Sequence, residues 1–128
     1  MESATLTQLT DRALTWCMDA LLAPNYRQMP FARAVECALG AEQSRRLRLR
    51  TRQCEPEESP SEVTFTLPRM TTRELYESTC VMFASATGYC ALAATAKGTP
   101  AFADFQSAAR FCGAVMTELR HQRRAIEK

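Results

Sequence analysis

The segment from Cys80 to Ala96, CVMFASATGYCALAATA, constrains the fold more than any other part of this chain because it contains no charged residue. A helix that spans a membrane needs about 20 mostly apolar residues. This run has 17 residues, is rich in alanine, and includes Ser85, Thr87, Gly88 and Thr95. A helix without a polar face is otherwise a buried one. The segment therefore predicts the central helix of a bundle rather than a membrane span.

Local signals place helix ends on both sides of this segment. Thr71 and Glu74 have the spacing of a capping box, and Gly98 is a natural helix stop. Pro100 suits the first turn of a further helix. That helix has an apolar stripe made of Phe102, Phe105, Ala109, Cys112, Val115, Met116 and Leu119. The sequence therefore predicts two consecutive helices joined by a short turn.

The first fifty residues predict further helices. One apolar face with helical spacing is formed by Leu6, Leu9, Ala13, Trp16, Cys17, Ala20 and Leu21. Pro30 suits the start of a second helix, and Gly40 weakens that helix or marks its end. In the following run, Arg45–Arg52, leucines alternate with arginines, so that both strand and helix stay open.

Residues from about 53 to 70 are expected to form a loop, since CEPEESPS is rich in proline, serine and glutamate. Residues 63–67, VTFTL, alternate like a short strand. Because the sequence predicts no second strand with which they could pair, we interpret them as an extended segment packed on helices. The chain is thus predicted to form a single all-α domain over residues 1–128, a bundle of about six to seven helices around a buried central helix.

The composition argues against catalysis and against metal or cofactor binding. The six cysteines include no C-x-x-C pair, the spacing that structural zinc sites usually need. The one histidine, His121, lies in a basic stretch without a neighbouring pattern for a base or a ligand, and the four glycines are isolated. The N-terminal residues lack the basic start and apolar core of a signal peptide. We therefore expect a non-enzymatic intracellular protein with reduced, mostly buried thiols. The even number of cysteines leaves a secreted, disulfide-bonded protein as the alternative.

The run Arg45–Arg52 is the best sequence argument for nucleic-acid binding. Its five arginines could pair with phosphates. However, the run contains no aromatic residue to stack on bases, and four glutamates follow closely. The net charge of +2 is also small. A locally balanced surface is the favoured interpretation, and nucleic-acid binding remains an alternative.

Residues 74–88 resemble the Bcl-2 family. Glu74, Leu75 and Tyr76 are similar to the end of that family's fourth helix, and the run VMFASATG, residues 81–88, is similar to its central fifth helix. FADFQSAARFCGAVMTELRHQ, residues 102–122, resembles the amphipathic sixth helix. Compact versions of this kind are typical of large DNA viruses that suppress apoptosis of the host cell. The resemblance implies an anti-apoptotic viral protein acting in host–virus interaction.

The resemblance also implies a partner and a site. The partners would be pro-apoptotic Bcl-2 proteins such as Bim, whose amphipathic homology-3 helix would lie in a hydrophobic groove. The expected location is the cytoplasm of the host cell, with association with mitochondria through partners. The implied groove residues are Leu39, Leu47, Arg73, Leu75, Val81, Met82 and Ala86. The alternative is that the six apolar residues of this set belong simply to the core.

One departure from the family concerns charge. Thr79 stands where the family has the arginine that pairs with an aspartate of the bound helix. Arg73, Arg69 or an arginine of the run 45–52 would have to replace it. A homodimer is a further expectation, and a self-assembling helical scaffold is an alternative function.

Overall fold

The protein is described by a computed structural model covering residues 6–21, 29–51 and 67–127. These residues form four helices, α2 (Asp11–Leu21), α3 (Pro30–Thr51), α4 (Thr72–Thr95) and α5 (Ala101–Glu127), with a short helical turn at residues 6–7. The prediction of an all-α protein is confirmed for this part of the chain. Most of the predicted loop, and residues 63–66 of the extended segment, lie outside the described residues.

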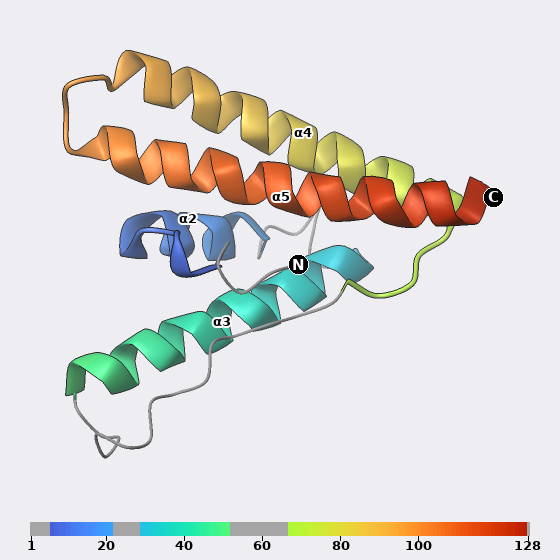
Figure 1. Ribbon diagram of the computed structural model, residues 1–128, viewed down its shortest axis with the longest axis horizontal. Coiled ribbons are helices and arrows are strands. Elements are labelled where there is room, and N and C mark those ends of the chain that lie inside the picture. Colours follow the sequence, from blue (N-terminus) through green and yellow to red (C-terminus); the bar gives the residue numbers. More distant parts are fainter. Residues whose placement is uncertain (1–5, 22–28, 52–66, 128) are drawn as a thin grey trace.

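The two longest helices, α4 and α5, form an antiparallel hairpin (Figure 1). The predicted capping box at the start of α4 is confirmed. The Thr71 hydroxyl accepts from the backbone N–H of Glu74 at 3.2 Å, and the Glu74 carboxylate accepts from the N–H of Thr71 at 2.9 Å. After α4, Gly98 adopts φ 83°, a backbone conformation that glycine reaches without steric cost, and so allows the chain to turn into α5.

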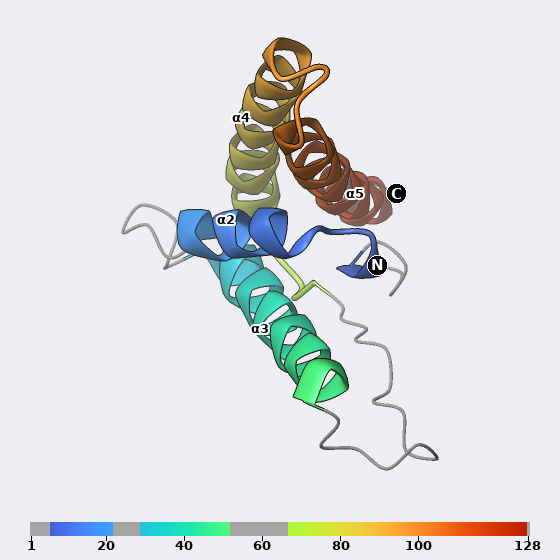
Figure 2. The same ribbon diagram turned by 90° about the vertical axis from the view of Figure 1, so that its left-hand side faces the viewer.

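Helix α2 lies between this hairpin and α3. Figure 2 shows α2 crossing beneath the hairpin, with α3 on its other side. The backbone of α2 is in contact with both α3 and α5. Two polar contacts fix its position on α5: Ser107 accepts a hydrogen bond from the Thr10 N–H at 3.3 Å, and Arg12 pairs with Asp104 at 3.8 Å.

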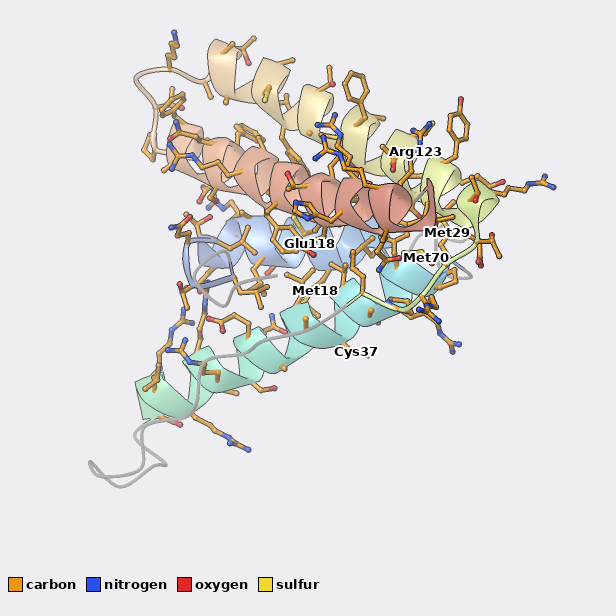
Figure 3. All side chains as sticks on the ribbon, turned by 45° about the vertical axis from the view of Figure 1, so that its right-hand side comes forward. Met18, Met29, Cys37, Met70, Glu118 and Arg123 are labelled. Atoms are coloured by element: carbon orange, nitrogen blue, oxygen red, sulfur yellow. The ribbon has the colours of Figure 1, made fainter. Side chains whose placement is uncertain are left out.

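The core lies where α2 meets α3 and α5. Its largest fully buried apolar side chains are Leu6, Leu14, Phe31, Val35, Leu39, Leu75, Val115 and Leu119. Methionines complete it at the junction of the helices (Figure 3): Met70 is buried, and Met18 and Met29 pack against the cluster. The flexible thioether of methionine fills irregular gaps well. The Met18 methyl group lies 3.9 Å from the position of a Cβ at Gly40, so α3 presents a smooth surface to α2 there.

The interpretation of residues 80–96 as a buried central helix is wrong. Helix α4 packs mainly on α5, at the edge of the molecule (Figure 1). Within residues 80–96 only Met82 and Ala93 are buried, and Phe83 is 59% exposed. The physical reason is that only one neighbouring helix covers α4 along most of its length. From Cys80 onward most of its residues are uncharged but exposed or only partly buried.

The helix boundaries in the first half differ from those predicted. The predicted first helix is interrupted after the turn at residues 6–7, and α2 begins at Asp11. The Thr10 hydroxyl accepts from the N–H of Ala13 at 3.2 Å and so caps α2. Helix α3 continues through Gly40 to Thr51, so the arginine run is helical as far as the structure describes it. The prediction of six to seven helices is not confirmed. The predicted second helix and most of the arginine run, expected as separate segments, form the single helix α3.

Across the described ranges, none of the helices combines the length and the apolar character that crossing a bilayer requires.

Candidate functional site

An apolar pocket opens where all four helices meet. It is lined by Cys17, Ala20 and Leu21 of α2, Val35 of α3, Val81, Met82, Ser85 and Tyr89 of α4, and Phe111 and Cys112 of α5. Its volume is about 360 Å³, including the open mouth. No carboxylate, histidine, lysine or arginine is among the lining residues. The pocket therefore suits an apolar group rather than acid–base chemistry.

Helical spacing explains which side chains reach this pocket. On α4, Val81, Ser85 and Tyr89 follow one another at intervals of four residues, so they lie on the same side of the helix. On α2, Cys17 and Leu21 have the same spacing and are buried. These sides of α2 and α4 form the pocket together with Val35 of α3 and with Phe111 and Cys112 of α5.

Three aromatic rings join α2, α4 and α5 beside the pocket. Trp16 stacks between Tyr89 and Phe105, with ring centroids 6.5 Å and 4.9 Å apart and interplanar angles of 10° and 24°. Offset stacked pairs contribute about 0.5–1.5 kcal/mol beyond the area that they bury. This stack connects α2 to both α4 and α5, and its Tyr89 also lines the pocket.

Two thiols and a phenol meet inside the pocket. The Cys17 sulfur lies close enough to the Cys112 thiol and the Tyr89 hydroxyl for both groups to act on its pKa. Cys112 lowers the pKa of Cys17 most, and Tyr89 adds to this effect, although burial opposes both. For Cys112, the contact with Cys17 raises the pKa most strongly. Burial is the main cause that raises the pKa of Tyr89. Cys17 is consequently the thiol of the group that ionises first.

The predicted groove residues of α4 lie at or beside this pocket. Val81 and Met82 line it, and Ala86 packs against the core next to it. Leu39 and Leu75 belong to the core, where both are fully buried. The structure therefore brings these five predicted residues into one apolar region.

The remaining two predicted residues lie elsewhere. Leu47 is 60% exposed on the distal half of α3, in a depression lined also by Asp11 and Arg50. Arg73 is exposed at the start of α4, where it pairs with Glu77 at 3.2 Å. Thr79, which stands at the position of the family's arginine, donates its hydroxyl hydrogen to the Leu75 carbonyl at 2.7 Å.

The arginine run takes part in the fold. Arg46 donates to the Glu42 carboxylate at 3.1 Å, to the Asp11 carboxylate at 2.9 Å, and to the carbonyls of Leu6 and Leu9 at 3.0 and 2.6 Å. Arg45 and Arg50 pair in the same network with Glu42 and Asp11, respectively. The buried Glu42 and the exposed Asp11 thus engage three arginines of this run; Arg52 lies outside the described residues.

Sequence reasoning missed the pocket cysteines. We expected mostly buried thiols, but Cys37, Cys80 and Cys90 are exposed, and among the cysteines that the structure describes only Cys17 and Cys112 are buried. Figure 3 shows Cys37 on α3. The two buried cysteines are 95 positions apart, so no local spacing could have paired them. The interval of four between Val81, Ser85 and Tyr89 was the one available signal for this face of α4.

Two further findings concern metal ligands and similarity to known proteins. In the described ranges no group of three or more histidine, cysteine, aspartate or glutamate side chains is arranged to bind a metal ion. Comparison of the chain with family models, with curated proteins and with solved structures found no match.

Proposed function

We propose that this protein binds an amphipathic helix of another protein and has no catalytic role of its own. The observation that supports this proposal is the uncharged pocket lined by Val81 and Met82. An amphipathic helix inserts hydrophobic anchors into such openings at intervals of three or four residues. Each anchor contributes roughly 25 cal/mol per Å² of apolar surface removed from water, before the costs of association.

The partner class comes from the resemblance of residues 74–88 to the Bcl-2 family. On this basis the bound helix is the homology-3 helix of a pro-apoptotic protein such as Bim, and the protein is a compact viral inhibitor of apoptosis. It would act in the cytoplasm of the host cell and reach mitochondria through its partners. By holding the helix, it would keep the pro-apoptotic protein from acting.

Binding of a whole helix requires α3 to move. Leu39 and Leu75 are fully buried, so they can become groove walls only if α3 separates from the hairpin. The backbone of α3 packs chiefly against α2 and makes few contacts with α4 and α5, which supports this movement. The pocket as described is too small for a whole side chain, so in this proposal the anchors enter as the groove opens.

The aspartate of the bound helix needs a cationic partner. Arg73 at the start of α4 is the best placed of the three candidates, because its exposed pair with Glu77 is easily exchanged. Arg46 is held by four acceptors within the fold and is the least free to turn outward.

The test is a titration of the protein with fluorescently labelled homology-3 peptides, followed by anisotropy. Ala86→Tyr should abolish binding, since it places a large side chain beside the pocket. Ala84→Tyr is the matched control, because Ala84 is exposed on the outer face of α4 and should leave affinity unchanged. Both variants are first shown to be folded by circular dichroism. Absence of binding by any peptide at micromolar protein, or equal affinity of the two variants, contradicts the proposal.

Self-assembly is a second candidate function, favoured by the outer face of α4. Tyr76 is 63% exposed and Phe83 59%, the two lie seven positions apart and so on the same side of the helix, and residues 80–96 carry no charge. Exposed apolar faces of this kind are typical of surfaces that associate. Light scattering during gel filtration should show a homodimer that Phe83→Glu dissociates. A monomeric unmodified protein at high micromolar concentration contradicts it.

Nucleic-acid binding through Arg45–Arg52 receives less support, because Arg45, Arg46 and Arg50 are engaged by carboxylates. A salt titration distinguishes it, since binding to phosphates weakens steeply as the salt concentration rises.

A further inference from the structure

The two buried cysteines come from different helices and meet in one pocket. Cys17 lies on α2 and Cys112 on α5, both are buried and line the same pocket, and each acts on the pKa of the other. Both are free thiols in this structure. We propose that Cys17 and Cys112 form an oxidisable pair that a small peroxide converts into an intrachain disulfide between α2 and α5.

The surroundings give the two sulfurs different roles. The neighbouring Cys112 and Tyr89 lower the pKa of Cys17, whereas the contact with Cys17 and burial raise the pKa of Cys112, so Cys17 loses its proton more readily. The thiolate is the nucleophilic form of cysteine. Cys17 therefore attacks the oxidant, and Cys112 resolves the intermediate.

The chemistry proceeds in two steps. The Cys17 thiolate attacks one oxygen of hydrogen peroxide, the O–O bond breaks, and hydroxide leaves, which gives a sulfenic acid on Cys17. The Cys112 sulfur then attacks the Cys17 sulfur, and the S–O bond breaks. The departing hydroxide takes the Cys112 proton and leaves as water. Overall, two thiols and one peroxide yield a disulfide and two waters, and two electrons pass from the sulfur pair to the peroxide.

The size of the pocket selects the oxidant. The free space among the lining side chains has room for about one water-sized molecule. A peroxide can reach Cys17 through such a space, while a bulky disulfide such as oxidised glutathione cannot. The exposed thiols of Cys37, Cys80 and Cys90 are open to both reagents. Peroxide and oxidised glutathione should therefore modify different cysteines.

The disulfide would have a structural consequence at the same place. It joins α2 to α5 through the wall of the pocket and closes a long stretch of chain in the unfolded state, which raises stability. The melting temperature should rise on oxidation and return to its original value with dithiothreitol.

The experiment uses the full chain with Cys37, Cys54, Cys80 and Cys90 replaced by serine, so that only the proposed pair can react. Peroxide should lower the intact mass by two hydrogen atoms. Tryptic digestion without reductant should then yield residues 13–27 linked to residues 111–120. Oxidised glutathione at equal concentration should form this link at least tenfold more slowly. If both thiols remain open to alkylation after peroxide treatment and unfolding, the proposal is overturned; equal rates with both oxidants overturn the role of the pocket.

Two single substitutions in this background separate the roles. Cys112→Ala should prevent the link and leave a sulfenic acid on Cys17 that dimedone traps. Cys17→Ala should leave Cys112 unmodified by peroxide. Dimedone labelling of Cys112 in that variant, at the rate at which Cys17 reacts, overturns the assignment of Cys17 as the attacking thiol. If neither variant folds, the mass and digestion results on the parent still decide the proposal.

Discussion

Arg46 contacts Glu42 across one turn of α3, with 3.1 Å between Nε and Oε1, and the Glu42 side chain is fully buried. The same guanidinium reaches Asp11 and the carbonyls of Leu6 and Leu9. It therefore fastens the start of the chain to α3. A buried carboxylate is tolerated only while cations compensate its charge.

Arg46→Met should lower the free energy of unfolding by about 3–5 kcal/mol, because it leaves the buried Glu42 carboxylate with Arg45 as its remaining cation among the described contacts. Glu42→Met should lower the free energy of unfolding clearly less, since Arg46 keeps its three other acceptors, Asp11 and the carbonyls of Leu6 and Leu9. Arg48→Met, on the exposed side of α3, is the control and should change stability by less than about 0.5 kcal/mol. Urea denaturation measures all three. Equal losses for Arg46→Met and Arg48→Met would show that the network does not stabilise the fold.

The stability should also depend on pH through Asp11. The hydrogen bond from Arg46, followed by the charges of Arg50 and Arg46, holds the pKa of Asp11 below its ordinary value of 3.8. A lowered carboxylate pKa means that the stabilisation is present above pH 3.8 and is lost as the pH falls through the lower folded value. The effect is small because Asp11 is exposed. The Asp11→Asn variant should be less stable than the unmodified protein at pH 7. Its free energy of unfolding should also fall less on acidification. Parallel acid profiles of the two proteins in low salt would contradict this assignment.

The capping box of α4 offers a local test. Thr71→Ala removes the acceptor for the Glu74 N–H and should cost about 1 kcal/mol of stability. Thr72→Ala, one residue further along and equally exposed, is the control and should be close to neutral. Thermal unfolding followed by circular dichroism compares the two. The same melting temperature for both variants would exclude a capping contribution.

Two phenylalanines test where α4 lies in the molecule. Phe31 is fully buried, so Phe31→Ala should lower the free energy of unfolding by about 3–5 kcal/mol. Phe83 is exposed on α4, so Phe83→Ala should change it by less than about 0.5 kcal/mol. Denaturant titration at a protein concentration too low for self-association makes the comparison. A cost for Phe83→Ala close to that of Phe31→Ala would mean that α4 is buried as the sequence suggested.

Helix ends were predictable where a few neighbouring residues decide them. Thr71 and Glu74 satisfy each other's backbone groups, and Gly98 takes a conformation that suits few other residues, so both signals act within one turn of chain. The start of α2 was not found, because the apolar spacing from Leu6 onward continues across the break. The new helix begins there because Thr10 caps it through the N–H of Ala13. The three-residue spacing of Thr10 and Ala13 allows this cap, but the sequence alone does not require it.

The arrangement of the helices was less predictable, and so was the candidate site. An uncharged segment predicts burial only if the rest of the chain supplies neighbours on all sides, and α4 has α5 along most of its length. The arginine run was ambiguous for the same reason, since its carboxylate partners include Asp11, far away in sequence. Likewise, nothing near Cys17 in the sequence points to Cys112. Val81 and Met82, which the resemblance assigned to a groove, line the apolar pocket, and their role in binding stays a prediction.

The short turn around Gly98 has a consequence for how the protein folds. It joins the two longest helices, which contact each other most extensively, so these contacts form between residues close in sequence and at a low cost in chain entropy. Contacts that are local in sequence form quickly. We expect the α4–α5 hairpin to assemble first and to serve as the surface on which α2 and then α3 dock. Substitutions within the hairpin should then slow folding, whereas substitutions at the Arg46 network should chiefly accelerate unfolding.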